Sequence, residues 1–200
     1  MCGIVGGITS KNITPLLLDG LKRLEYRGYD SSGLVILSQD NKLVRERAAG
    51  KVSNLENNLK RIKPSLKGNV GLAHTRWATH GKPSVNNAHP HISKNSISVV
   101  HNGIIENYID LKDLQMKQGY AFTSETDTEV IAHAIESAIK PSDSLLKATQ
   151  KAIKTLNGSY GIGVLSSKYP DQIIAARKGS PLVIGIGDNG NYVASDQMAL

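Results

Sequence analysis

The order of the predicted strands and helices constrains the fold of this 200-residue chain most strongly. Strands come in adjacent pairs and helices come in blocks, so the two element types do not alternate regularly. A regular βαβ alternation would favour a parallel sheet, whereas this order favours antiparallel sheets covered by helices. The length is sufficient for one domain with a hydrophobic core. We therefore expect a protein of the α+β class.

Short apolar runs bounded by turn residues predict the strands. They cover residues 4–8, 34–37, 43–47, 70–74, 97–101, 160–166, 173–176, 182–186 and 192–194. Apolar residues at helical spacing predict five helices. These cover residues 15–27, 53–63, 105–118, 126–139 and 145–156. Thr14 is expected to cap the first helix, and capping boxes at Ser53–Glu56 and Thr126–Glu129 are expected to open the second and fourth.

The cysteine count and the absence of long apolar runs narrow the class of protein. A single cysteine excludes an internal disulfide and fits a reducing compartment. The N-terminus has no basic segment followed by a long apolar run, and position two is not the glycine that myristoylation requires. No apolar stretch approaches the about 20 residues that a membrane helix needs. We expect a cytoplasmic protein with no membrane partner.

The formal net charge of +7 raises the question of nucleic-acid binding. The positive residues are spread along the sequence, and one Trp and one Phe do not supply a base-stacking platform. The six histidines lack a compelling metal-ligand spacing with accompanying carboxylates. We therefore expect a solvated basic surface, no nucleic-acid partner, no metal and no cofactor.

Cys2 is the residue with the clearest chemical potential. Removal of Met1, which a small second residue favours, would make Cys2 the first residue of the chain. It would then carry a thiol with a pKa of about 8.5 and an α-amino group with a pKa of about 7.7–8.0. A partly neutral amine near pH 7 is suited to accept the thiol proton. The alternative is a buried cysteine acting as a small apolar side chain.

Polar residues follow several predicted strands, and each has a structural alternative. Arg76 is suited to bind a carboxylate through two hydrogen bonds, or to form an ordinary surface ion pair. Asn102 and Gly103 are suited to form an oxyanion hole, although Asn-Gly is also a hairpin turn signal. Asp127 is suited to bind an ammonium group, or to cap a helix. Spacing alone leaves these alternatives open.

Six segments taken together resemble the glutaminase domains of glucosamine-6-phosphate synthases, which are class II glutamine amidotransferases and N-terminal nucleophile hydrolases. The segments are Met1–Gly6, Arg23–Ser31, His74–Gly81, Asn87–Pro90, His101–Asn107 and Ser124–Glu129. The resemblance covers residues 1–200 as one type 2 glutamine amidotransferase domain. It implies a four-layer αββα sandwich of two mainly antiparallel sheets between helical layers.

The resemblance also implies roles for individual residues. Cys2 would attack the side-chain amide of L-glutamine, and Asn102 and the N–H of Gly103 would hold the oxyanion. Residues that would bind the substrate are Arg76, at the α-carboxylate, Asp127, at the α-ammonium, and Trp77, Thr79 and His80 around the pocket. The products would be glutamate and ammonia, formed through a cysteinyl thioester. The ammonia would go to fructose 6-phosphate to make glucosamine 6-phosphate.

The resemblance also indicates what the sequence lacks. The synthases carry a C-terminal sugar isomerase half, which is not present here, and their glutaminase domain continues somewhat beyond residue 200. We expect a C-terminally truncated domain whose partner is that isomerase half, within a longer protein that forms a homo-oligomer. Two alternatives stay open, namely an amidotransferase domain that serves another acceptor and a non-catalytic glutamine-binding sensor.

Overall fold

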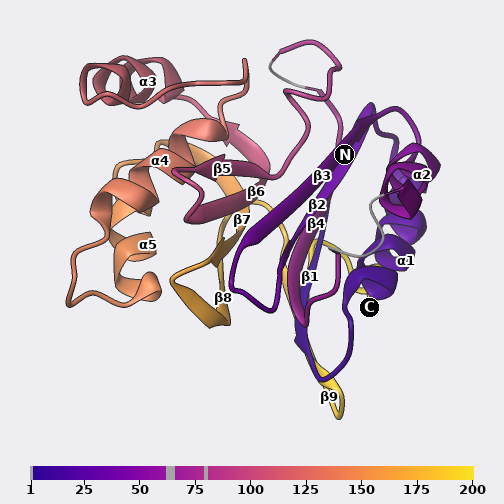
Figure 1. Ribbon diagram of the computed structural model, residues 1–200. Helices are drawn as coiled ribbons and strands as arrows, with labels where there is room; N and C mark the ends of the chain where they lie inside the picture. Colours follow the sequence, from indigo (N-terminus) through magenta and orange to yellow (C-terminus); the bar gives the residue numbers. More distant parts are fainter. Residues whose placement is uncertain (1, 62–65, 79–80) are drawn as a thin grey trace.

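The computed structural model describes residues 2–61, 66–78 and 81–200, arranged as two packed β-sheets between helical layers (Figure 1). Helices α1 (Thr14–Leu24) and α2 (Val52–Arg61) cover the outer face of one sheet. Helices α4 (Glu129–Ala138) and α5 (Leu145–Ile153) cover the outer face of the other. This confirms the α+β class and the αββα order of layers. α3 contacts α4 at one end of the sandwich.

The first sheet has six strands in the order β3-β2-β4-β1-β10-β9, and every neighbouring pair is antiparallel. Its strands are β1 (Gly3–Thr9), β2 (Ser31–Leu37), β3 (Leu43–Ala49), β4 (Val70–Arg76), β9 (Val183–Gly187) and β10 (Gly190–Ala194). Helices α1 (Thr14–Leu24) and α2 (Val52–Arg61) pack on it. The short 3-10 turns are η1 (Glu25–Arg27) and η2 (Gln197–Ala199).

The second sheet has four antiparallel strands in the order β5-β6-β7-β8. They are β5 (His91–Ser93), β6 (Ile97–Ile105), β7 (Gly158–Ser166) and β8 (Tyr169–Lys178). The remaining helices are α3 (Tyr108–Lys117), α4 (Glu129–Ala138) and α5 (Leu145–Ile153). The sequence pattern predicted nine of the ten strands found in the described residues and missed β5, which has only three residues.

Three apolar clusters hold the layers together, one at each interface. Leu17, Leu21 and Leu55 belong to the cluster between α1, α2 and the first sheet. Ile131 and Ile135 belong to the cluster between α4 and the second sheet. A third cluster fills the space between the sheets, and its buried members are Ile4, Val35, Leu37, Val70, Leu72, Val100, Leu165 and Val193. Successive residues of a strand point to opposite faces, so each sheet contributes to two of these clusters.

The predicted helix caps at Thr14, Ser53 and Thr126 are wrong. α1 starts at Thr14 with Ile13 as its N-cap, and the Thr14 hydroxyl donates to the Leu66 carbonyl instead. α2 starts one residue before Ser53, because the Glu25 carboxylate accepts the Val52 N–H from another element. α4 starts at Glu129 rather than near Thr126. At α1 and α2, non-local polar partners therefore replaced the local ones that the capping patterns predicted, whereas at α4 the Glu129 carboxylate accepts hydrogen bonds from Thr123 and Ser124, before the expected cap.

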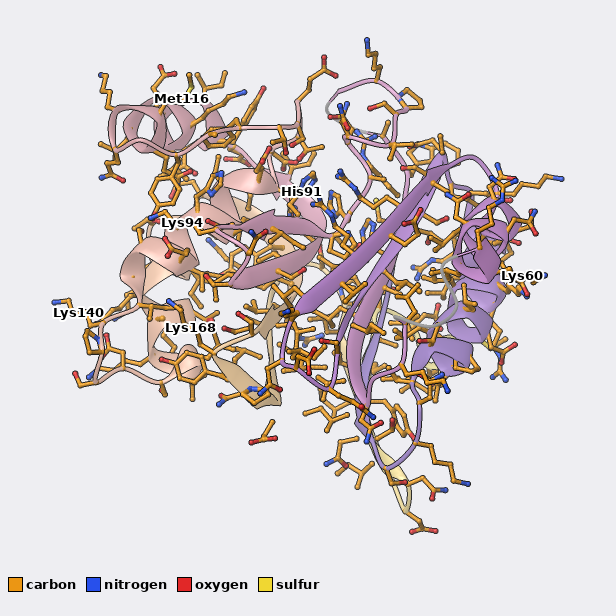
Figure 2. All side chains as sticks on the ribbon, in the orientation of Figure 1. Lys60, His91, Lys94, Met116, Lys140 and Lys168 are labelled. Carbon is orange, nitrogen blue, oxygen red and sulfur yellow. The ribbon has the colours of Figure 1, made fainter. Side chains whose placement is uncertain are left out.

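Most lysines in the described part of the chain are exposed, as the sequence suggested, whereas Arg76 is buried. Lys60 lies on the α1–α2 side of the molecule, and Lys94, Lys140 and Lys168 lie on the opposite side, near α4 and α5 (Figure 2). None of the helices in the described part of the chain is long and apolar enough to cross a membrane.

Candidate active site

The strand register places Cys2 next to the end of β4. β1 and β4 are antiparallel, and Gly3 pairs with Thr75, so the residue before β1 lies beside the last residue of β4. Residues 2 and 76 are far apart in sequence, yet the sheet brings the thiol and the Arg76 side chain to one edge. The predicted nucleophile and the predicted carboxylate-binding residue therefore share a site.

The space between the sheets changes from apolar to polar at this edge. Leu72 of β4 belongs to the apolar cluster between the sheets, and His74, two residues later, lies on the same face. Val100 of β6 belongs to that cluster too, and Asn102 follows on its face. His74 and Asn102 meet across the gap, with 3.0 Å between the His74 Nε2 and the Asn102 Oδ1.

The Cys2 thiol contacts two backbone groups of Trp77. The Trp77 N–H donates to Sγ at 3.2 Å, and the Trp77 carbonyl lies 3.5 Å from Sγ. Burial raises the pKa of the Cys2 thiol above its ordinary value, although the Trp77 contact opposes this rise. The thiol is therefore protonated in the resting site at neutral pH and needs a base. Among the described residues, no side-chain base is hydrogen-bonded to Sγ.

Asn102 and Gly103 lie within β6 and not in the hairpin turn that was their alternative. The Asn102 Nδ2 donates to the carbonyl of Cys2 at 3.1 Å, which places this amide beside the nucleophile. Gly103 has a φ of 135°, and a Cβ there would lie 2.1 Å from the Ser159 carbonyl oxygen on the paired strand. Glycine lets β6 continue alongside β7 at this point, and Gly103 lines the same pocket as Cys2.

Two buried charges of opposite sign lie at the same pocket. Arg76 is 3% exposed, and its guanidinium donates to the Gly81 carbonyl at 3.0 Å and lies 3.4 Å from Asp30 Oδ1. Asp127 is 4% exposed, and its Oδ2 accepts the Ile105 N–H at 2.8 Å. A fixed cation and a fixed anion in one pocket suit a zwitterionic ligand.

A narrow pocket joins most of the residues that the sequence singled out. Its lining residues are Cys2, Arg76, Trp77, His89, His101, Gly103, Thr126, Asp127 and Thr128. The Trp77 side chain is 53% exposed at the rim. Thr79 and His80, which were also predicted to bind substrate, lie outside the described residues.

Sequence reasoning gave no role to several polar residues that support the site. The Asp30 carboxylate accepts the Ala78 N–H and thereby holds the segment that follows β4. Asn87 and Glu125 form two mutual hydrogen bonds, at 2.8 and 2.9 Å, which tie the next loop to the segment before α4. Asp30, Asn87 and Glu125 all lie within the sequence motifs on which the family resemblance rests. Membership in those motifs was the sequence feature that could have identified them.

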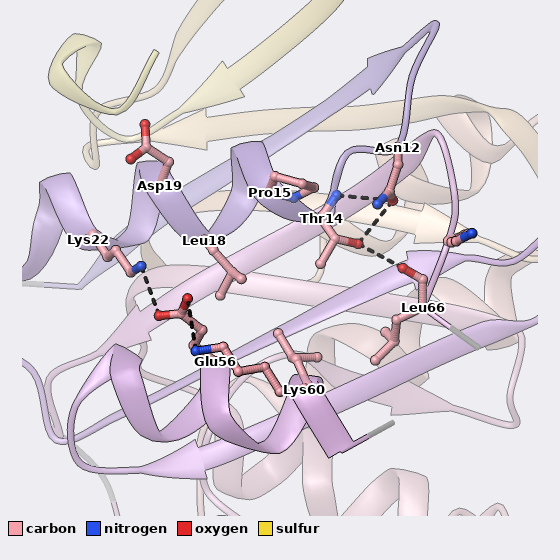
Figure 3. Close-up of a pocket in the computed structure, with 11 residues that line it drawn as sticks. Asn12, Thr14, Pro15, Leu18, Asp19, Lys22, Glu56, Lys60 and Leu66 are labelled. Carbon is pink, nitrogen blue, oxygen red and sulfur yellow. Dashed lines mark hydrogen bonds and ion pairs between the residues drawn. The ribbon is translucent and has the colours of Figure 1, made fainter. Parts of the chain in front are cut away.

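A wider hollow lies elsewhere, between α1 and α2 (Figure 3). An ion pair of 2.8 Å between Lys22 and Glu56 crosses it, and Leu18 and Leu59 form part of its wall. None of the predicted site residues lines this hollow. The chemistry is therefore concentrated at the narrow pocket. In the described ranges, no group of three or more His, Cys, Asp or Glu side chains is arranged to hold a metal ion.

Comparison with known families shows the family to which this chain belongs. A family model described as "Glutamine amidotransferase domain" matches residues 74–200. The chain belongs to the glutamine amidotransferase domain family. This membership confirms the resemblance seen in the sequence motifs. It also places Arg76, Asn102, Gly103 and Asp127 within the matched part of this amidotransferase domain.

Relatives of the amidotransferase domain cover its whole length. Proteins named glutamine–fructose-6-phosphate aminotransferase (isomerizing) from Pseudomonas putida and Haemophilus influenzae are 54% and 53% identical over 200 residues. Those residues are 100% of this chain and 32% of each relative. The chain thus spans about a third of the length of the curated relatives it matches, so those relatives carry a large further part.

Solved structures show the same fold. The glutamine phosphoribosylpyrophosphate amidotransferase from B. subtilis, complexed with ADP and GMP, matches with a TM-score of 0.82 and 26% identity. The match covers 99% of this chain and 42% of that one. A glutamine aminotransferase class-II domain protein from Silicibacter pomeroyi shares the fold with a TM-score of 0.67 at 16% identity.

Proposed function

We propose that this amidotransferase domain hydrolyses the side-chain amide of L-glutamine to glutamate and ammonia, with Cys2 as the nucleophile after removal of Met1. The observation that carries the proposal is that Cys2, Arg76 and Asp127 line one pocket, while the Asn102 amide donates to the Cys2 carbonyl beside it. An amide substrate with a zwitterionic end needs these four kinds of group together.

The proposed reaction has two halves. The Cys2 thiol attacks the side-chain amide carbon of glutamine, while its proton passes to the α-amino group of the same residue. Asn102 and the Gly103 N–H stabilise the oxyanion, and one such donor contributes about 2.7–4 kcal/mol in a comparable site. The C–N bond then breaks, and ammonia leaves with the proton returned. Water attacks the γ-glutamyl thioester, which yields glutamate and restores the thiol.

The terminal amine is proposed as the base because of what surrounds Sγ. Burial raises the pKa of the Cys2 thiol, so attack requires removal of its proton. The polar contacts that the described residues make with Sγ come from the Trp77 backbone, which is not a base. An α-amino group titrates near the operating pH, as an efficient general base should.

For the complete protein we propose the acceptor named for the curated relatives described above. Ammonia would pass to fructose 6-phosphate in a C-terminal isomerase half, within a homo-oligomeric cytoplasmic enzyme, to give glucosamine 6-phosphate. The relatives' names and their threefold greater length support this choice. Transfer to a phosphoribosyl acceptor is the second candidate, because a glutamine phosphoribosylpyrophosphate amidotransferase has a closely similar fold.

The release of glutamate from glutamine by the purified chain tests the proposed function. We expect one glutamate and one ammonia for each glutamine consumed, and stoichiometric labelling of Cys2 by a glutamine analogue that carries an electrophile at the side-chain amide position. Glutamine binding measured by calorimetry without any glutamate release would contradict hydrolysis and support the non-catalytic sensor.

The charge of Asp127 should control affinity for glutamine. Asp127→Asn keeps an oxygen to accept the Ile105 N–H but removes the negative charge. We expect the KM for glutamine to rise at least about thirtyfold, because truncating one partner of a buried charge pair costs about 2–5 kcal/mol. Steady-state glutamate release measures this change. The exposed Asp113→Asn on α3 is the matched control and should leave the KM unchanged.

A deaminated substrate separates the ammonium role of Asp127 from a structural one. Glutaramate is glutamine without its α-ammonium group. The unmodified protein should strongly prefer glutamine, and Asp127→Asn should lose most of that preference. A variant that discriminates between the two compounds as well as the unmodified protein would contradict the assigned role.

A further inference from the structure

His74 lies at the point where the two sheets meet the active site. It is fully buried on β4, and its ring stacks on His89 with 4.2 Å between ring centroids. Its Nε2 is 3.0 Å from Asn102 Oδ1 and 3.0 Å from the backbone oxygen of His101. The proposed reaction assigns no step to this imidazole.

The two partners of Nε2 determine where the imidazole carries its proton. A carbonyl oxygen accepts hydrogen bonds, and the Asn102 Oδ1 does the same. Nε2 must therefore be the protonated nitrogen, which donates to both oxygens. Nδ1 has no hydrogen-bond partner among the described residues. Hydrogen bonds therefore anchor the ring at its Nε2 end.

The Nε2–H of His74 in turn determines the orientation of the Asn102 amide. When the Asn102 Oδ1 accepts the hydrogen bond from His74, the Asn102 Nδ2 points the other way and donates to the Cys2 carbonyl at 3.1 Å. Rotating the amide by half a turn would set its NH2 group against another N–H donor, and it would lose both contacts.

We propose that His74 is a positioning residue that keeps the NH2 group of Asn102 directed towards Cys2, whose carbonyl accepts a hydrogen bond from it. This inference rests on the proposed function, since it concerns the donor that would stabilise the oxyanion. A preorganised donor needs no reorientation when charge develops on the substrate oxygen. His74 itself does not touch the substrate and acts through Asn102.

Burial favours the neutral imidazole that this role requires. It lowers the pKa of His74 to about 3, so the ring stays neutral throughout the physiological range. The orientation of Asn102 should therefore not depend on pH between about pH 5 and about pH 8.

The kinetic test combines His74→Phe with Asn102→Ala. His74→Phe should lower the kcat for glutamate release about 10- to 100-fold, which is less than the about 10²- to 10³-fold expected for losing a donor outright. The KM for glutamine should change less than about twofold, because ground-state binding is untouched. In the Asn102→Ala background, His74→Phe should have almost no further effect on kcat. Multiplicative losses in the double variant would overturn the proposal.

Two further variants separate positioning from folding. His133→Phe is the matched control, because His133 is equally buried but lies on α4, where it contacts Ser93. It should retain kcat, and an equal loss there would overturn the proposal. His74→Gln keeps an N–H donor and should recover part of the kcat lost in His74→Phe. If His74→Phe does not fold, the comparison of His74→Gln with and without Asn102→Ala decides the same question.

NMR of the full chain without substrate tests the orientation independently of turnover. We expect the His74 ring to carry its proton on Nε2 from about pH 5 to about pH 8, and the Asn102 NH2 signals to shift in His74→Gln but not in His133→Phe. A proton on Nδ1, or unshifted Asn102 signals, would overturn the proposal. If the unmodified protein releases no glutamate, the proposed function fails, and these spectra still decide whether His74 orients Asn102.

Discussion

Cys2→Ala is expected to abolish glutamine hydrolysis and leave the fold intact. Loss of a catalytic nucleophile lowers kcat by about 10⁶-fold in a well-studied hydrolase, so no residual turnover should be measurable here. The stability change should be small, because the substitution removes only the hydrogen bonds between Sγ and the Trp77 backbone. Such a loss is about 1 kcal/mol, or a few degrees in Tm.

Alkylation provides a matched control for this substitution, because Cys2 is the only cysteine in the chain. One equivalent of iodoacetamide should abolish glutamate release in the unmodified protein, and glutamine should protect against it. Cys2→Ala should take up no label and should still bind glutamine in a calorimetric titration. Undiminished glutamate release by Cys2→Ala of verified mass would refute the nucleophile.

Stability is expected to fall steeply as the pH drops from about 7 to about 5, because of a cluster formed by His74, His89 and His91. Burial lowers the pKa of His74 to about 3 and holds the pKa values of His89 and His91 well below 6.5. The folded state therefore excludes protons that the unfolded chain binds below about pH 6.5. Stability is complete above that pH and decreases as the pH falls towards the folded-state pKa values.

The expected size of the acid effect is large relative to the stability of a domain. Each excluded proton lowers the free energy of unfolding by about 1.4 kcal/mol per pH unit, or about 2 kcal/mol in total by pH 5. The effect of His74 alone is a substantial part of the 5–15 kcal/mol of a typical domain, and His89 and His91 act in the same direction. The lowered pKa values of carboxylates such as Glu56 and Asp143 become relevant only at lower pH.

Urea unfolding followed by circular dichroism at several pH values measures the acid effect. The slope of unfolding free energy against pH should correspond to more than one proton taken up on unfolding, because burial lowers the pKa values of His89, His91 and His133 as well as that of His74. His91→Gln keeps a side-chain group that can hydrogen-bond the Thr126 hydroxyl, as the His91 Nε2 does, but does not titrate. It should reduce the slope by about one proton. A free energy that is flat between about pH 7.5 and about pH 5.5 would show that these histidines are not excluded from protonation.

Local patterns predicted the element types well because they depend on local physics. Apolar periodicity identified the helices, and Arg76 at the end of β4 and Gly103 near the end of β6 line the candidate site. Arg76 and Asn102 could be singled out from the sequence because a polar residue in a buried strand costs free energy unless it has a binding partner. The αββα layering, however, came from the family resemblance, since local patterns do not state how two sheets pack.

Non-local contacts explain what the sequence pattern missed. β6 was expected to end at His101, but the absence of a Cβ at Gly103 lets it continue beside Ser159. The expected cap at Ser53 failed because Glu25, far away in sequence, caps α2. The contact between His74 and Asn102 joins two different sheets and leaves no local signal in the sequence.

The central claim is that the processed chain end supplies both the attacking sulfur and its base. The most direct measurement combines intact mass with glutamate release for one chain that carries a removable segment before Cys2 and a matched chain tagged at the other end. Activity should be absent while the segment is present and should appear in proportion to the fraction of chains that begin at Cys2. Equal turnover by chains in which the Cys2 nitrogen remains an amide would contradict the mechanism.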